Sequence, residues 1–243
     1  MGKLYVIGIG PGGLEHMTLK AKQAIEESNI VVGYNKYIDM IKPLVEDKEL
    51  FSTGMRGEEA RCRKALELSK ENNTVALIST GDSGIYGMAG LILQMQEGES
   101  VEIIPGVTAS SAAGSVIGAP LMHDNCNISL SDLMTPYDLI KKRVRNAADA
   151  DMIISLYNPR SKGRPHYLRE AIEIINEGIL ENKDEGFLYY NRACFYVCIN
   201  KLDLALEDIL KSIELNDFFE EYMKEDEDLD AIRKLEKYKE IFG

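Results

Sequence analysis

The chain has 243 residues with 40 acidic against 28 basic side chains, and its formal net charge of −12 argues against nucleic acid as the main partner. Its 45% hydrophobic and 28% charged residues are typical of a globular protein, and no apolar run is long enough to span a membrane. The four cysteines form no Cys-x-x-Cys pair, which indicates a reducing cytoplasm and leaves no metal site to predict.

The apolar run at residues 4–8 predicts a buried parallel strand. It leads into a glycine-rich loop with the sequence GIGPGG at residues 8–13. Glycines at the carboxyl end of a strand let the backbone approach a ligand closely. The same letters satisfy the Gly-x-Gly-x-x-Gly fingerprint of nicotinamide sites, so two classes of ligand have to be distinguished.

Two departures from that fingerprint disfavour a nicotinamide site. The second predicted strand, residues 29–33, is followed by Tyr34 and Asn35, where an acidic residue would hold the ribose hydroxyls. Pro11 lacks the N–H that a phosphate-binding loop would donate. A nicotinamide oxidoreductase is therefore the least favoured alternative.

Helices and strands are expected to alternate as far as residue 117. We predict helices at residues 18–28, 36–45, 58–72, 88–96 and 109–117, and strands at 49–53, 73–79 and 100–105. This order predicts an α/β fold with a mostly parallel sheet, whose ligands bind at the carboxyl ends of the strands. The glycine-rich loop after residue 79 contains one carboxylate, Asp82, which is expected either to bind a cofactor or to cap its own loop.

The sequence Gly-Ala-Pro-Leu at residues 118–121 interrupts this alternation and predicts a domain boundary. Beyond it we predict strands at 127–131 and 152–157, helices at 136–148 and 166–176, and a basic loop at 158–165.

Several polar residues of this second half are candidate site residues. His123 and Asp124 suggest an acid–base pair or, equally, a hydrogen bond that stabilises a hinge. Ser129, Ser131 and Asp132 alternate along the edge of a predicted strand, where they are expected either to meet polar groups of a ligand or to form a plain edge.

Four motifs in this order resemble the tetrapyrrole methylases, S-adenosylmethionine enzymes that act on corrin and sirohaem precursors. The motifs are GIGPGG at 8–13, STGDSGIYGMA at 79–89, IPGVTASSAA at 104–113 and LYNPRSKGRPH at 156–166. The stretches at 119–136 and 156–171 narrow the resemblance to the C17-methyltransferases of precorrin-3B and cobalt-factor III. The resemblance covers residues 1 to about 177.

The resemblance implies two α/β domains with the cofactor in the cleft between them and a corrin precursor in an adjoining trough. It implies methyl transfer to C17 with contraction of the ring between C1 and C19. S-adenosylmethionine would be held by Gly10, Pro11, Gly12, Thr80, Gly81, Asp82, Ile85, Thr108, Ala109, Leu156 and Tyr157. The substrate would be met by Ser129, Asp132, Arg160, Lys162 and Arg164.

The chemistry of the site follows from the same resemblance. The acetate and propionate groups of the ring need cations, which Arg160, Lys162 and Arg164 would supply. The alternative is that these three residues form a basic turn exposed to solvent. A sulfonium methyl is electrophilic and the ring carbon is electron-rich, so the protein has to position the two rather than supply a nucleophile. No catalytic residue is assigned, and the candidates are His123, Asp124 and Ser131.

The resemblance stops near residue 177, where the family would continue with three more strands. Residues 186–217 instead resemble one tetratricopeptide repeat, whose helix-packing positions would be Tyr189, Ala193, Tyr196, Ala205 and Ile209. The charge changes at the same place, because residues 179–243 hold 17 acidic against nine basic side chains. We therefore predict a fusion of an N-terminal α/β domain (1–118), a truncated second α/β domain (119–177) and an acidic helical tail (178–243).

Two functions remain open at this point. The first is a methyltransferase of cobalamin synthesis, weakened if the missing strands supply part of the adenine pocket and of the trough. The second is a non-catalytic chimera whose helical tail binds a protein partner. A single repeat leaves apolar helix faces uncovered, so the tail is expected to pack on the methylase part, to pack on another chain, or to remain partly molten. A homodimer is a further expectation, although the missing strands commonly carry dimer contacts in the family.

Overall fold

The computed structural model describes residues 2–117, 121, 123–132, 134–150, 152–159, 166–181, 183–184, 186–198, 200–226 and 229–242. Its strands are β1 (Lys3–Gly8), β2 (Ile30–Tyr34), β3 (Glu49–Thr53), β4 (Thr74–Ser79), β5 (Val101–Ile104), β6 (Asn125–Ser129) and β7 (Ile153–Tyr157). Its α-helices are α1 (Leu19–Glu27), α2 (Asn35–Met40), α3 (Glu58–Lys70), α4 (Ala89–Met95), α5 (Ala109–Ile117), α6 (Tyr137–Asp149), α7 (Tyr167–Glu181), α8 (Gly186–Cys198), α9 (Leu202–Leu215), α10 (Phe218–Glu225), α11 (Asp230–Arg233) and α12 (Glu236–Phe242).

The chain divides into two compact units, Met1–Ala113 and Gly114–Gly243. Each is described by itself below. The three-part division at residues 118 and 177 stays a prediction.

The first unit is built on a five-stranded parallel sheet in the order β3-β2-β4-β1-β5. This confirms the α/β fold with a parallel sheet that the alternating pattern predicted. The central strands β1 and β4 are in register from Lys3 opposite Thr74 to Gly8 opposite Ser79, so both end at the same level. The loops that follow them therefore start side by side.

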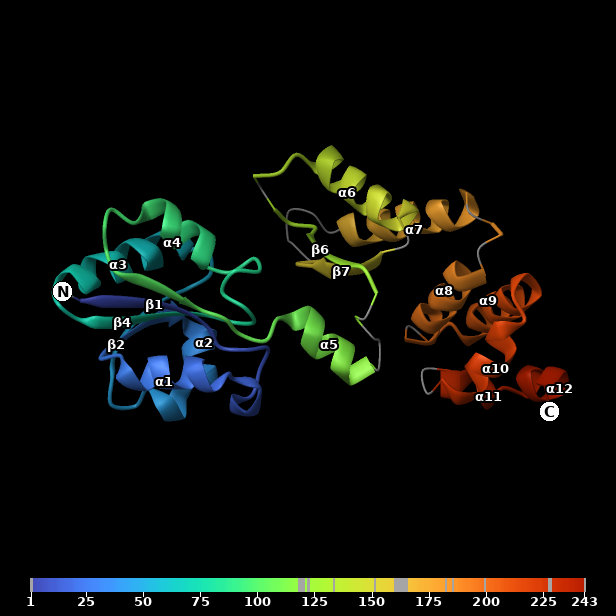
Figure 1. The fold of residues 1–243 in the computed structure, drawn as a ribbon, viewed down its shortest axis with the longest axis horizontal. Helices are drawn as coiled ribbons and strands as arrows, with labels where there is room; N and C mark the ends of the chain where they lie inside the picture. The colour runs from blue at the N-terminus through green and yellow to red at the C-terminus, as the bar shows by residue number, and fades with distance from the viewer. Residues whose placement is uncertain are drawn as a thin grey trace. The chain divides into compact units, whose positions relative to one another are not determined.

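Helices cover both faces of this sheet, as Figure 1 shows, with α3 and α4 on one face and α1 and α2 on the other. Alternate residues of β1 point into the two resulting cores, with Leu4 in one and Tyr5 in the other. Helix α1 begins where predicted because the Thr18 hydroxyl accepts a hydrogen bond from the Ala21 N–H at 3.1 Å. Burial on both faces explains the continuous apolar runs in the central strands.

The second unit contains a parallel pair of strands, β6 and β7, in register from Asn125 opposite Ile153 to Ser129 opposite Tyr157. Helices α6 and α7 pack with this pair in one apolar core that includes Ile128, Ile140 and Ile174. Helices α8 to α12 build a separate core around Ala193, Ala205 and Ile209. The residues predicted to pack the repeat are buried or half-buried there, while its identity as a tetratricopeptide repeat stays a prediction.

Three predicted boundaries were wrong. The helix expected at 36–45 ends at Met40 and gives way to a 3₁₀ turn, Lys42–Leu44, because Pro43 lacks an N–H and disfavours the α conformation in the residue before it. The helix expected to end at residue 176 runs on to Glu181, since one interior glycine costs only about 1 kcal/mol.

The third wrong boundary affects candidate site residues. The strand expected at 127–131 is β6, which ends at Ser129, so Ser131 and Asp132 lie in a turn and not along a strand edge. The Asp132 carboxylate accepts hydrogen bonds from the Met134 N–H at 2.9 Å and from the Thr135 hydroxyl at 2.6 Å. Such local bonds stabilise a turn at the expense of a strand.

Candidate functional site

The loops after β1 and β4 are joined by a pair of backbone hydrogen bonds. Gly10 N–H donates to the Gly81 carbonyl at 3.1 Å, and Gly81 N–H donates to the Gly10 carbonyl at 2.7 Å. The Thr80 hydroxyl also donates to the Gly10 carbonyl at 3.2 Å. Both glycines have a left-handed φ, +81° and +67°, which other residues rarely adopt.

The loop after β5 reaches the same place through a third glycine. A Cβ on Gly106 would lie 2.2 Å from the Gly81 carbonyl oxygen and 2.6 Å from that of Gly8. Only glycine therefore lets these three loops meet. On its open side, Gly81 faces Thr108 and Ala109, where a Cβ would find its nearest atoms at 3.9 to 4.0 Å.

The Asp82 carboxylate joins the loop after β4 to the loop after β5 through hydrogen bonds. Its Oδ1 accepts from the N–H groups of Gly84 at 2.8 Å and Ile85 at 3.2 Å, and its Oδ2 accepts from the Gly106 N–H at 3.0 Å. Of the two predicted roles, the structure thus displays loop capping. A carboxylate offers about four lone-pair positions, so three bonds leave room for one more donor.

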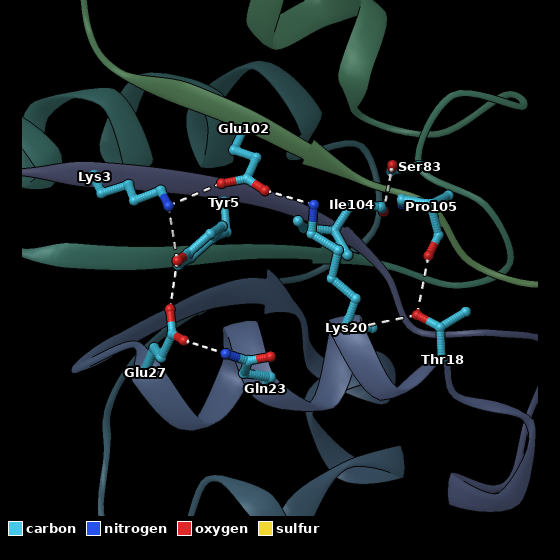
Figure 2. Close-up of polar contacts among 11 residues, drawn as sticks. Lys3, Tyr5, Thr18, Lys20, Gln23, Glu27, Ser83, Glu102, Ile104 and Pro105 are labelled. Atoms are coloured by element: carbon cyan, nitrogen blue, oxygen red, sulfur yellow. Dashed lines mark hydrogen bonds and ion pairs between the residues drawn. The ribbon is translucent and has the colours of Figure 1, made fainter.

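Two hydroxyl groups complete the connection between the loops, as Figure 2 shows. Ser83 is fully buried and donates to the Ile104 carbonyl at 3.0 Å, which holds the β4 loop on β5. The Thr18 hydroxyl, which caps α1, donates to the Pro105 carbonyl at 3.3 Å. The helix after β1 is therefore fixed to the loop after β5.

A charged network in the same view lies further back along the sheet, toward the starts of β1 and β5 (Figure 2). Glu102 on β5 pairs with Lys3 at 2.8 Å and with Lys20 of α1 at 2.7 Å. The two ammonium groups, Lys20 more than Lys3, lower the pKa of Glu102 to about 2. The carboxylate stays ionised through the physiological range and links β1, β5 and α1.

The candidates in the second unit lie at the carboxyl end of the β6–β7 pair. Leu156 is part of the α6–α7 core and Tyr157, half-buried, ends β7. Ser129 ends β6 and accepts a hydrogen bond from the Asn158 side chain at 3.0 Å. Asn158 has a positive φ of 51°, which asparagine tolerates in turns.

The remaining candidates of the second unit lie before β6, in the turn after it, or outside the described residues. His123 and Asp124 are exposed just before β6, and the Asp124 carbonyl accepts from the Ile153 N–H at 2.9 Å. In the turn, hydrogen bonds from Thr135 and then Met134 lower the pKa of Asp132. Arg160, Lys162 and Arg164 lie outside the described residues.

Sequence reasoning named the glycine motifs but missed the residues that join them. Gly106 and Ser83 belong to the quoted motifs, but the sequence predicted no role for either. In the structure Gly106 allows the loops to approach one another, and Ser83 bonds the loop after β4 to β5. Ser79, at the end of β4, was also missed, and its buried hydroxyl has no hydrogen-bond partner in the part of the chain that is described. Small residues in all three loops were the only available signal.

No group of three His, Cys, Asp or Glu side chains in the described ranges is placed to hold a metal ion. Within the same ranges, none of the helices combines the length and the apolar character that a membrane span requires.

Comparison with known proteins identifies the family. A family model described as Tetrapyrrole (Corrin/Porphyrin) Methylases matches residues 3–195, which extends past residue 177 into α8. A relative from Salmonella typhimurium, named probable cobalt-factor III C(17)-methyltransferase, is 49% identical over 176 residues, covering 71% of this chain and 73% of the relative. A precorrin-3B C(17)-methyltransferase from a Sinorhizobium species is 40% identical over 181 residues, covering 72% of this chain and 71% of the relative.

A solved structure agrees with these relatives. The crystal structure of the methyltransferase CobJ matches with a TM-score of 0.69 at 38% identity, covering 73% of this chain and 77% of that chain. This chain belongs to the tetrapyrrole methylases.

Proposed function

We propose that this chain is an S-adenosylmethionine-dependent C-methyltransferase of cobalamin synthesis, acting on C17 of cobalt-factor III or precorrin-3B with contraction of the ring. Relatives at 49% and 40% identity are named for these two activities. The observation that carries the proposal is the backbone pair between Gly10 and Gly81, which brings the two glycine loops of the family into one edge.

The residues at this edge fit the methyl donor of the family. The side of Gly81 on which other residues carry a Cβ opens toward Thr108 and Ala109, and a Cβ there would fill that space. A Cβ on Gly12 would have nothing within 4 Å, so this part of the loop also leaves room for a ligand. In this proposal Pro11 and Ile85 add apolar contacts, and Leu156 with Tyr157 are contributed by the second unit.

S-adenosylmethionine supplies a methyl group on a sulfonium sulfur, which is electrophilic without further activation. The task of the protein is to align this methyl group with the ring carbon and to hold that alignment. Asp82 serves this task by fixing the loops after β4 and β5 to each other. We propose Ser129, Asp132, Arg160, Lys162 and Arg164 as substrate contacts, and His123, Asp124 and Ser131 as candidates for proton transfer.

Methyl transfer is tested with labelled S-adenosylmethionine and each of the two ring substrates in parallel. Label is expected in the ring, and the substrate that gives the larger kcat/KM is the physiological one. Calorimetric titration with S-adenosylhomocysteine tests the cofactor site separately. Heat of binding without label in the ring would favour the non-catalytic alternative, whereas no heat at millimolar ligand would contradict the cofactor site itself.

A second proposal concerns the tail. We propose that α8 and α9 form one tetratricopeptide-like pair, fused near residues 177–185, that binds a protein partner or a second copy of the chain in the cytoplasm. The observation that favours it is the separate apolar core of α8 to α12. Light scattering of the full chain at several concentrations tests self-association, and a constant monomer mass would leave a different protein as the partner.

A further inference from the structure

The loop between β3 and α3, residues 54–57, lies at the same sheet edge as the glycine loops. Thr53 at the end of β3 is opposite Tyr34 of β2, and Val32 of β2 is opposite Leu77 of β4. Two residues further along, Tyr34 is thus level with Ser79, where β4 ends. Strands β3, β2, β4 and β1 therefore finish at one level, and two strand spacings, about 10 Å, separate β3 from β4.

Arg56 in this loop has a backbone conformation that its residue type does not favour. Five described residues other than glycine have a positive φ, and three of them are asparagines, which tolerate it. Arg56 has a φ of 68° and lacks the short polar side chain that makes this conformation tolerable for asparagine. Strained conformations of this kind cluster at ligand sites, where the surrounding structure maintains them.

The buried Arg61 of α3 maintains the conformation of the loop. Its side chain is 5% exposed, and its Nη1 donates to the Thr53 hydroxyl at 2.6 Å and to the Gly54 carbonyl at 3.2 Å. Its Nη2 contacts the Glu58 carboxylate at 3.3 Å. One buried guanidinium thus ties the end of β3 to the loop and to the first turn of α3.

The carboxylates that follow Arg56 in the sequence already have other partners, and Arg56 pairs with neither of them. Glu58 is paired with Arg61, and Glu59 with Arg63 at 2.6 Å. The exposed side chain of Arg56 makes no ion pair or hydrogen bond with the described part of the chain. The same is true of Lys36, which lies two residues beyond the end of β2.

The neighbouring surface suits a conjugated ring. Tyr34, the last residue of β2, and Tyr37 of α2 form an edge-to-face pair with ring centroids 5.1 Å apart. Aromatic faces together with free cations match a flat macrocycle whose periphery bears acetate and propionate groups. At this position a nicotinamide enzyme would instead have an acidic residue.

We propose that Arg56, supported by Lys36, binds a peripheral carboxylate of the tetrapyrrole substrate, and that Arg61 positions the loop that presents Arg56. This inference rests on the proposed function, because it requires a polycarboxylate ring as the substrate. It assigns the binding of that carboxylate to the β3 side of the sheet in the first unit.

The experiment compares Arg56→Gln, Lys36→Gln and the double variant with the full-length wild type. Arg63→Gln is the matched control, because it removes the same charge from an exposed position on α3. Binding of cobalt-factor III is followed by its absorbance at two salt concentrations with S-adenosylhomocysteine present, and binding of S-adenosylhomocysteine is measured alone by calorimetry. We expect Arg56→Gln to raise the Kd and KM for the ring about ten-fold, with a shallower salt dependence and unchanged kcat.

Arg56→Gly separates ligand binding from structural support. Glycine removes both the cation and the conformational cost, so its Tm should equal or exceed that of the wild type while ring binding weakens. A fall in Tm would show a structural residue and overturn the proposal. Equal ring affinity in Arg56→Gln, the control and the wild type would also overturn it, while leaving the proposed function intact. A wild type that binds S-adenosylhomocysteine but no ring would overturn both.

Discussion

Strands β4 and β7 are both parallel strands that lead into a predicted cofactor loop, but their surroundings differ. Strand β4 lies between β1 and β2, and five of its six residues are buried. Strand β7 pairs with β6 and is only half-buried at every position. The first strand is stabilised by two neighbours and by helices on both faces, whereas the second depends on fewer contacts.

The loops that follow these two strands also differ in how many contacts attach them to neighbouring elements. The loop after β4 is attached to the loop after β1 through Gly81, to β5 through Ser83, and to the loop after β5 through Asp82. In the described residues after β7, Asn158 is attached to β6 through one side-chain bond to Ser129. The comparison teaches that the first unit pre-organises its share of the site through several contacts at once, namely one reciprocal backbone pair and two side-chain bonds.

The largest expected effect comes from crowding the meeting point of the three loops. Gly106→Ala would place a methyl group 2.2 Å from the Gly81 carbonyl oxygen, a backbone atom that has no freedom to move away. We expect a loss of more than about 3 kcal/mol of unfolding free energy and no heat on titration with S-adenosylhomocysteine.

The matched control is Gly90→Ala in α4, where an added Cβ has nothing within 4 Å. It should be neutral or gain up to about 1 kcal/mol. Similar losses for the two variants in urea unfolding would show that the crowded contact is not the cause.

Equal truncations in the two sheets test the comparison directly. Leu77→Ala in β4 removes a fully buried side chain and should cost about 3 to 4 kcal/mol. Leu156→Ala in β7 removes a half-buried one and should cost about 1 to 2 kcal/mol. Urea unfolding followed by circular dichroism measures both, and equal costs would remove the distinction between the sheets.

Loss of the buried ion pair in the tail should act on the second unit alone. Arg192 donates to both carboxylate oxygens of Asp208 at 2.7 Å, and Asp208 is 5% exposed. Asp208→Ala should cost about 2 kcal/mol because it leaves the guanidinium without its partner. The exposed control, Glu214→Ala, breaks the pair with Lys211 and should cost no more than about 0.5 kcal/mol.

Calorimetric melting of the full chain shows whether this loss is local. If the tail melts separately, only one transition moves in Asp208→Ala and binding of S-adenosylhomocysteine is retained. A single transition that moves as a whole would mean that the tail and the methylase part unfold together.

The smallest expected effect is the pH dependence of the network around Glu102. Its pKa is lowered to about 2 by Lys20 and Lys3, so its contribution to stability is complete above the ordinary pKa of 4.5 and is lost as the pH falls toward 2. Glu102→Gln should therefore lower Tm slightly at pH 7, and the difference from wild type should shrink below pH 4.5. A difference that stays constant from pH 7 to pH 3 would contradict this origin.

Much of the first unit could be predicted, because its central strands β1, β2 and β4 are apolar runs closed by glycine or a polar turn. The motifs also led to the family and to the loops that meet at the sheet edge. The role of Gly106 could not be predicted, since it depends on three loops far apart in the sequence coming together. The same holds for Arg61, which looks like an ordinary helix-surface residue yet is 4% exposed.

The second unit was predicted less accurately for a physical reason. Strand β6 has one partner among the described residues and is buried only at its last two positions, so its apolar signal is weaker, and it was placed two residues too late. The turn around Asp132 is stabilised by its own side chain, which competes with extension of the strand. Local hydrogen bonding there outweighed the alternation of side chains.

The reciprocal bond pair between Gly10 and Gly81 also supplies built-in reporters of ligand occupancy. The two amide hydrogens are shielded by each other's loop, so they exchange with solvent only when both loops separate. A ligand that spans the loops opposes this separation, and the exchange of both amides should slow by the same factor. Two backbone protons thus record the separation of the two loops.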